Sequence, residues 1–248
     1  MVPYPAALDL PHTLVEWMTM LIVTREGDRR CKLPPSQRAI TTLIHPREHT
    51  TYAKPTAGFR ISEDTAHTYV PSVIRLLASR TPPLTQALRR ARPEYALVDG
   101  TIAQCDQVGD RERNHSGKAR RHGANIQAVT GPAGELIRYS PALPGRTTDI
   151  TTARTHHIIT VCQRLRIPIL TDKAYVTAGG TFQVPFKRHL GPPSPPDRQP
   201  PTTHTRLRFP LERAFARLKT QRTFHKARTN PNRPTSTTKT ILTLEKRH

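Results

Sequence analysis

The spacing of apolar residues changes once along the chain. In the first part apolar side chains recur every three or four positions, as Leu14, Met18 and Leu21 do, which is the period of a helix with one buried face. In the second part short apolar runs end in turn residues, as strands do. The pattern therefore predicts a mostly helical region over 12–92 and an α/β region over 93–248.

A turn followed by a helix stands out in the first region. The segment Gly58-Phe59-Arg60-Ile61-Ser62 precedes a helical pattern over 64–70, and Ser62 is suited to cap that helix because its hydroxyl can accept a backbone N–H. A turn and a recognition helix in this order outline a helix-turn-helix. Ordinary packing of short helices produces the same pattern, so the residues alone leave both interpretations open.

Strands and helices alternate in the second region. Strands are predicted over 95–105, 123–130, 136–142 and 167–171, with one helix over 147–165. Three strands, a crossover helix and a strand parallel to the first make the order of a ribonuclease-H-like mixed sheet flanked by helices. Six prolines over 191–205 predict an extended loop, and the segment 223–248 predicts a last helix on the sheet.

Three acidic residues of this region occupy positions from which carboxylates can meet. Asp99 and Asp172 each end an apolar run, and Glu212 lies in a helical pattern. Taken singly, each acid has a structural explanation: a turn acid, a partner of Lys173, and an acid in the first turn of a helix. Together they indicate a site for Mg²⁺ or Mn²⁺, which prefer oxygen ligands.

The sequences around these acids resemble the three motifs of DDE-type insertion-sequence transposases, nearest to the DDE superfamily endonucleases that are similar to Harbinger-type transposases. The motifs are Val98-Asp99-Gly100-Thr101, Leu170-Thr171-Asp172-Lys173-Ala174-Tyr175, and the segment from Leu211-Glu212-Arg213 to Lys219. The acids are 73 and 40 residues apart. The resemblance implies that Asp99, Asp172 and Glu212 are catalytic and bind two divalent ions, with Asp99 on both, Asp172 on one and Glu212 on the other. It also implies an N-terminal helix-turn-helix.

Asp149 is a fourth acid in the region. The resembling family also carries an aspartate at this place. Because Asp149 stands at the start of the helix predicted over 147–165, we expect it to stabilise that helix end rather than to bind metal.

Nucleic acid is the partner that the composition favours. The net charge is +21 and the sequence pI is about 11.1, and 30 arginines outnumber 9 lysines. Cations bind the phosphate backbone, and the planar guanidinium suits phosphate and guanine edges. The residues expected to contact DNA are Lys118, Arg120, Arg121, His122, Lys173 and Lys219. The first four resemble the family's Lys-x-x-x-His-Gly-x-Asn stretch, and a solvated charge run is the alternative explanation.

Four residues depart from the family pattern. Pro46 and Pro55 fall where the family has uninterrupted helix, Ala174 replaces a glycine, and Pro201 replaces an asparagine. An interior proline disfavours a helix, so the first two departures predict a shortened DNA-reading module. The departures also raise an alternative function, a decayed or repurposed transposase that only binds DNA. A second alternative is another ribonuclease-H-like nuclease, such as a junction resolvase, which would cut branched DNA.

A transposase acts on the terminal inverted repeats of its element and on target DNA, and bringing two element ends together requires at least a homodimer. The cysteines Cys31, Cys105 and Cys162 are odd in number and far apart, which predicts neither a disulfide framework nor a zinc site. The apolar stretch from Leu14 to Val23 contains Glu16 and is too short to span a bilayer. We therefore expect a bacterial cytoplasmic protein on the nucleoid, without membrane association.

Overall fold

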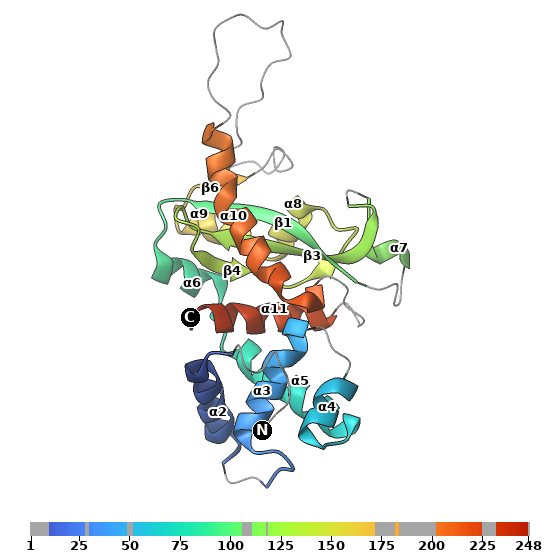
Figure 1. Ribbon diagram of the computed structural model, residues 1–248. Coiled ribbons are helices and arrows are strands. Elements are labelled where there is room, and N and C mark those ends of the chain that lie inside the picture. The colour runs from blue at the N-terminus through green and yellow to red at the C-terminus, as the bar shows by residue number, and fades with distance from the viewer. Residues whose placement is uncertain are drawn as a thin grey trace, which may run out of the picture.

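The protein is described from a computed structural model, over residues 10–27, 30–48, 52–105, 111–117, 119–171, 182–183, 202–224 and 232–247 (Figure 1). The part of the chain before the sheet is helical, which confirms the predicted secondary structure of this region. Its helices are α2 (His12–Glu26), α3 (Pro35–Glu48), α4 (Ala53–Phe59), α5 (Glu63–Ser79) and α6 (Leu84–Ala91). Within the described ranges no helix is long and apolar enough to cross a membrane.

Helix α5 begins where the sequence predicts. The hydroxyl of Ser62 accepts a hydrogen bond from the backbone N–H of Thr65 at 3.3 Å, which satisfies one of the free donors at the helix start. Arg60 ends α4 in the left-handed conformation with φ 53°, so the chain turns sharply between α4 and α5. The two helices and their turn have the outline of the predicted helix-turn-helix.

The helices persist through their prolines. Helix α3 continues beyond Pro46 to Glu48, and α5 continues beyond Pro71 to its end at Ser79. Pro55 is the third residue of α4, where the N–H has no acceptor within the helix and its loss costs little. Neither proline interrupts its helix, and the prediction that Pro46 and Pro55 shorten this region stays a prediction, because residues 49–51 after α3 lie outside the described ranges.

The largest cluster of buried side chains in the helical region joins α2, α3 and α5, and a smaller one packs Tyr52 against Ala66 and Val70 of α5. Leu14, Met18 and Ile22 of α2 pack against α3 and the C-terminal half of α5. The members of the cluster from these two helices are Ala39, Leu43, Val73, Leu76 and Leu77. Because the contacts on α5 come from its later turns, its first turns contribute little to this cluster.

The sheet is mixed, as predicted. Its strands are β1 (Ala96–Gln104), β2 (His115–Ser116), β3 (Arg121–Thr130), β4 (Leu136–Tyr139), β5 (Leu143–Pro144), β6 (Ile169–Thr171) and β7 (Phe182–Gln183). The order is β2-β3-β1-β6-β7, with β4 and β5 also paired to β3. Strand β1 is antiparallel to β3 and parallel to β6. This mixed α/β architecture is compatible with the ribonuclease-H-like fold.

The crossover between β5 and β6 differs from the prediction. Two short helices, α8 (Asp149–Thr155) and α9 (Ile158–Arg164), replace the single helix expected over 147–165. The break is at His157, whose φ is 55°. A left-handed residue redirects the chain, so that α9 buries Cys162 against the same face of the sheet that α8 covers.

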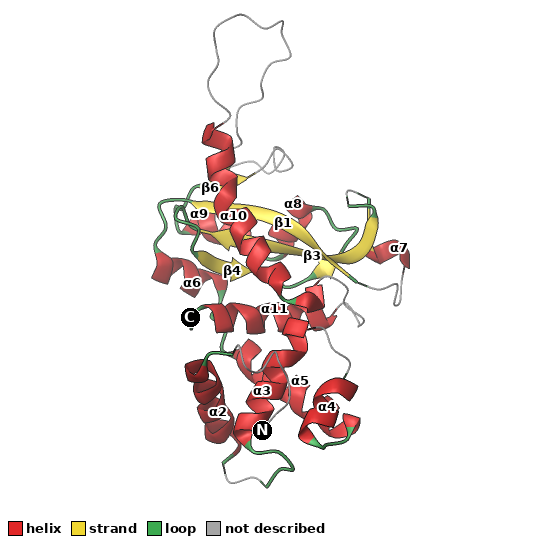
Figure 2. Ribbon diagram, in the orientation of Figure 1, coloured by secondary structure: helices red, strands yellow, loops and turns green. Residues whose placement is uncertain are grey.

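Helix α10 spans Thr202–Thr220. It begins inside the segment 191–205 that was predicted as loop, so that prediction is wrong for residues 202–205. The physical reason is local, because the run of prolines ends at Pro201 and the next proline is Pro210. Figure 2 shows α10 crossing one face of the strands.

The last helix, α11 (Asn232–Glu245), lies between the sheet and the N-terminal helices (Figure 1). The side chains that α11 buries against the sheet are Ile241 and Leu242. On its other side the hydroxyl of Thr240 donates to the carbonyl of Ile74 at 3.0 Å, and that of Thr243 donates to the carbonyl of Leu77 at 3.1 Å. The predicted packing of a last helix on the sheet is confirmed, and the same helix also binds α5.

Candidate active site

Asp99 lies on the face of the sheet that α10 covers. Side chains alternate along a strand, and Leu97 and Ala103, an even number of residues away, both pack with α10. The residue paired with Asp99 across the ladder is Ala128, which belongs to the same buried cluster. Asp99 is half-buried, and its Oδ1 accepts the backbone N–H of Gly100 at 2.8 Å. The carboxylate is therefore oriented and faces α10.

Asp172 lies outside the described residues, but β6, the strand that precedes it, is described and lies next to β1. Strand β6 pairs in parallel with β1, and the last pair of the register is Val98 with Thr171. Asp99 and Asp172 are the next residues of the two chains. The register thus brings the chain to the same level of the sheet immediately before each acid.

Glu212 is an exposed residue of α10. Its neighbours on the helix, Leu211, Ala214, Phe215 and Leu218, pack on the face of the sheet that carries Asp99. Asp99 and Glu212 therefore belong to two layers in direct contact. Helix α10 also carries His204 and Arg208, at four-residue spacing before Glu212.

The metal site remains a prediction. In the part of the chain that is described, no three side chains of histidine, cysteine, aspartate or glutamate come together as ligands, and Asp172 is not in that part. The donors that are described fit a hard divalent ion, because a half-buried aspartate and an exposed glutamate on facing layers offer carboxylate oxygens.

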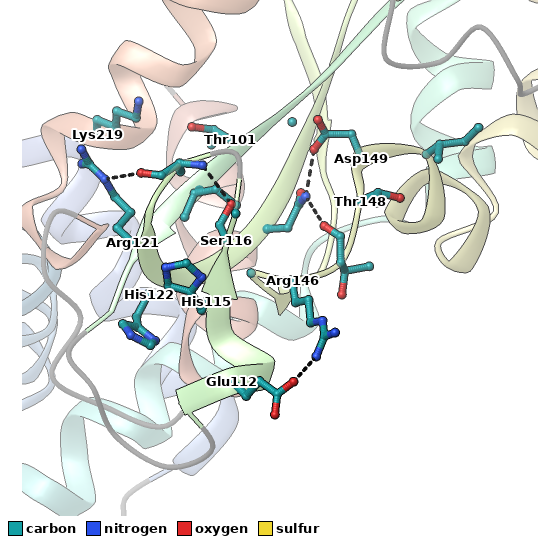
Figure 3. Close-up of a pocket in the computed structure, with 18 residues that line it drawn as sticks. Thr101, Glu112, His115, Ser116, Arg121, His122, Arg146, Thr148, Asp149 and Lys219 are labelled. Atoms are coloured by element: carbon teal, nitrogen blue, oxygen red, sulfur yellow. Dashed lines mark hydrogen bonds and ion pairs between the residues drawn. The ribbon is translucent and has the colours of Figure 1, made fainter.

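A cleft of about 1320 Å³ is lined by the second half of β1, from Gly100 to Ile102, and by the first half of β3 (Figure 3). Its other walls come from β2, α7 (Arg111–Asn114), the segment before α8, the first residues of α8 including Asp149, and Lys219 of α10, while Asp99 and Glu212 are not among its lining residues. The basic and imidazole side chains that line it are His115, Arg121, His122, Arg146 and Lys219. The rings of His115 and His122 meet edge to face with centroids 5.2 Å apart. Arg146 pairs with the exposed Glu112, Nη1 to Oε1, at 2.6 Å. The cleft therefore presents positive charge that can meet phosphate.

The structure brings together three of the six residues predicted to contact DNA. Arg121, His122 and Lys219 line the cleft, although Lys219 comes from a helix nearly a hundred residues later in the chain. Arg120 is exposed and adjacent, with a left-handed backbone at φ 50°. Lys118 and Lys173 lie outside the described residues. Contact of all six with DNA stays a prediction.

Asp149 is on the opposite face of the sheet from Asp99. It is the first residue of α8, and its Oδ1 accepts a hydrogen bond from Nδ2 of Asn125 at 2.8 Å. The backbone carbonyl of Asp149 accepts a second bond from Gln127 Nε2 at 2.5 Å. A Cβ atom at Gly100 would overlap the Asp149 carboxylate, so the carboxylate occupies the space that the missing side chain leaves. Asp149 thus joins the start of α8 to β3 and β1.

Two residues near Glu212 were missed by sequence reasoning. Phe209 is 56% exposed, and the guanidinium carbon of Arg213 lies 4.8 Å from the centroid of its ring. The signal was available, since Phe209 falls off the apolar stripe that α10 buries. Arg146 was missed as well, and no spacing in the sequence connects it to the other cations of the cleft.

A half-buried aspartate on a mixed sheet, a glutamate on the covering helix and a cleft lined by cations are features expected of an enzyme that acts on nucleic acid. The family model described as DDE superfamily endonuclease matches residues 98–244, and the model described as helix-turn-helix of DDE superfamily endonuclease matches residues 31–83, which include α3, α4 and α5. The chain belongs to the DDE superfamily endonucleases. None of the curated proteins matches it.

The family matches confirm the resemblance seen in the sequence, and they extend to both regions of the chain. They establish a DNA-binding protein of the transposase type with a DNA-cleaving domain. Enzymes of this superfamily generally use divalent metal ions. The Harbinger-like subfamily is not specified by these matches.

Proposed function

We propose that this protein is an active transposase, which cleaves DNA at the terminal inverted repeats of an insertion sequence and joins the freed 3′-hydroxyl to target DNA. The observation that carries the proposal is the register of β1 and β6. It ends immediately before Asp99 and Asp172, on a sheet whose Asp99 face is covered by the helix that carries Glu212. This arrangement supports a site in which the three carboxylates converge.

The protein's own residues have distinct roles in this reaction. Asp99, Asp172 and Glu212 hold two Mg²⁺ or Mn²⁺ ions, which supply an activated water and stabilise the leaving oxyanion when they are bound. The backbone N–H of Gly100 fixes the orientation of the Asp99 carboxylate. Lys219 and Arg121, at the edge of the cleft, contact phosphates of the same strand and position it.

The helix-turn-helix supplies recognition. Helix α5 buries its C-terminal half against α2 and α3, while exposed residues at its start, Glu63, Asp64, His67 and Thr68, are available to the major groove. Two inverted repeats are brought together by two copies of the chain, so the active form is a homo-oligomer on DNA. The site of action is the bacterial nucleoid.

Cleavage of labelled duplex DNA tests the proposal. The substrate carries the inverted repeat that flanks the coding region, with Mg²⁺, Mn²⁺ or chelator. Asp99→Asn, Asp172→Asn and Glu212→Gln each keep the side-chain volume, and each is expected to lower cleavage by at least about 100-fold, because one ligand of the metal site is lost. Glu94→Gln, a change at an exposed residue just before β1, is the matched control and retains full activity.

Three outcomes would contradict the proposal. Tight binding of the repeat without any metal-dependent cleavage would instead indicate a protein that only binds DNA. Cutting of branched DNA regardless of the repeat would indicate a resolvase-type nuclease. Full cleavage by any of the three carboxamide variants would remove that residue from the site.

A further inference from the structure

The exposed side of α10 carries an aromatic ring with a stacked guanidinium. Phe209 is one of the three large hydrophobic side chains exposed in the described ranges, and the other two, Met20 and Val23, both belong to α2. The guanidinium of Arg213, 4.8 Å from the ring centroid, covers one face of the Phe209 ring. With 56% of the residue exposed, the rest of the ring is open to a ligand.

Phe209 stands one helical turn before Glu212, the proposed catalytic glutamate, and Arg213 directly follows that glutamate. Residues three and four positions apart are neighbours on a helix surface, so Phe209 lies beside both Glu212 and Arg213. The buried face of the same helix is made by other residues, Leu211, Ala214, Phe215 and Leu218. Phe209 is therefore not part of the face that holds α10 on the sheet, and within the described ranges the ring contact of Phe209 is with Arg213.

The surroundings favour nucleic acid as that partner. Exposed cations follow Phe209 along α10, with Arg213 one turn later and Arg217 and Lys219 on the two flanks of the helix, and Lys219 lines the cleft. A flat ring next to cations matches the chemistry of a nucleotide, since the ring stacks on the base while the cations contact its phosphates. A protein surface of net positive charge, such as a second copy of this chain at +21, matches it poorly.

We propose that Phe209 and Arg213 form a stacking platform for an unpaired nucleobase of the DNA strand whose phosphate lies at Glu212. A base inside a duplex is already stacked on both sides, so the ligand is a base in a single-stranded flank or one turned out of the helix. Stacking on a ring depends little on which base is present, and the platform therefore positions the strand without reading its sequence. This inference rests on the proposed function.

Binding measured with the full chain in chelator, where no cleavage occurs, tests the platform. Two DNAs carry the same repeat, one fully paired and one with a single-stranded flank at the cleavage end. Phe209→Ala and Phe209→Leu are expected to weaken binding of the flanked DNA by about 5- to 150-fold, which is the value of one stacked base, and to change binding of the paired DNA less than about 2-fold. Phe209→Trp keeps a ring and retains the affinity.

A fluorescent base analogue, 2-aminopurine, in the flank gives a second readout. Stacking quenches its emission, so the wild-type chain and Phe209→Trp lower the fluorescence, while Phe209→Ala and Phe209→Leu leave it high. Met20→Ala removes an exposed apolar side chain from α2 and is the matched control, with no change in either measurement. Circular dichroism identifies any variant that fails to fold. If Phe209→Ala does not fold, the affinities of Phe209→Leu and Phe209→Trp for the flanked DNA show whether an aromatic ring is needed.

The platform is refuted if alanine and leucine variants bind both DNAs as the wild type does, or lose affinity for both equally. It is also refuted if these variants change the oligomeric mass of the protein, because Phe209 would then contact a second copy. Metal-dependent cleavage that persists in such a case leaves the proposed function standing. The converse result is a wild-type chain that quenches the base analogue but shows no metal-dependent cleavage, which leaves the platform standing and overturns the proposed function, so the two failures are distinguishable.

Discussion

Gly100 follows the aspartate of the first motif, and the structure explains why a side chain is not accepted there. A Cβ atom at this position would overlap Oδ1 of Asp149 and lie 2.7 Å from its Cγ. Gly100→Ala must therefore displace the Asp149 carboxylate, which is bonded to Asn125. Overpacking costs about 1–3 kcal/mol, and a lost hydrogen bond adds about 1 kcal/mol. We expect Gly100→Ala to lower the free energy of unfolding by about 2–4 kcal/mol.

Urea unfolding of the single and double variants measures this directly. Asp149→Ala removes the group that the new methyl would meet, so Gly100→Ala is expected to cost at least about 1 kcal/mol less in that background. Gly58→Ala is the control, because a Cβ at Gly58 meets nothing within 4 Å and the residue lies in helix α4, where alanine is expected to stabilise by about 0.5–1 kcal/mol. A cost for Gly100→Ala below about 0.5 kcal/mol, or strict additivity with Asp149→Ala, would refute the placement of Asp149 under β1.

Three further predictions follow from buried and exposed charges. Burial raises the pKa of Glu245 from 4.5 to about 7, so the folded state holds this proton more tightly than the unfolded state and stability falls as pH rises between these values. Glu245→Gln should therefore stabilise the protein by about 1–3 kcal/mol at pH 8 and by little at pH 4. Equal effects in thermal melts at both pH values would contradict this. Arg38 is 3% exposed and bonded to Glu26 by Nη1 at 2.6 Å and Nη2 at 2.8 Å; Arg38→Ala breaks this buried ion pair and should cost about 3–5 kcal/mol in urea unfolding, more than Arg38→Ala in a Glu26→Ala background, and equal costs in the two backgrounds would contradict this. Lys219→Ala and Arg121→Ala should each reduce the slope of log affinity against log salt by about 1 for duplex DNA, and unchanged slopes would exclude phosphate contacts.

Local pattern was sufficient for much of the fold. The apolar run before Asp172 located the end of β6, and a serine before a helical pattern located the start of α5, because these features depend on neighbouring residues alone. Asp99 ends an apolar run of the sequence, but strand β1 continues beyond it to Gln104. The break at His157 was not predictable in this way, since the sequence there has no glycine or proline. It follows from the need of α9 to bury its apolar side against the sheet.

The candidate site was predictable to a similar degree. The acids could be named from their positions after apolar runs and in a helix, but the face on which each lies depends on pairings between distant segments. Asp149 shows this most clearly, because only the ladder of β1 and β3 places Asn125 and Gly100 around its carboxylate. Lys219 joins the cleft only because α10 packs across the sheet.

Side chains alternate between the two faces of the sheet along β1, so two consecutive residues of this strand have different roles. Asp99 faces α10 and the proposed metal site, while Gly100 faces α8 and accommodates Asp149. A register shift of one residue in β1 would exchange the two faces and remove both functions together. The pairing of β1 with β3 over eight consecutive residue pairs opposes such a shift.

Helix α11 contacts both the helix-turn-helix region and the sheet that carries the candidate site. Its side chains share a buried cluster with α10 and the sheet, and its threonines Thr240 and Thr243 donate to carbonyls near the C-terminal half of α5. The start of α5, which would enter the DNA groove, is left outside these contacts. Helix α11 therefore contributes to the orientation of the helix-turn-helix relative to Asp99 and Glu212, together with the contact of α3 with the short turn Arg222–Phe224, and Thr240→Val with Thr243→Val should loosen that orientation. We expect the double variant to keep its affinity for the repeat while its cleavage position becomes less uniform, and a uniform position at full rate would show that α11 does not set the geometry.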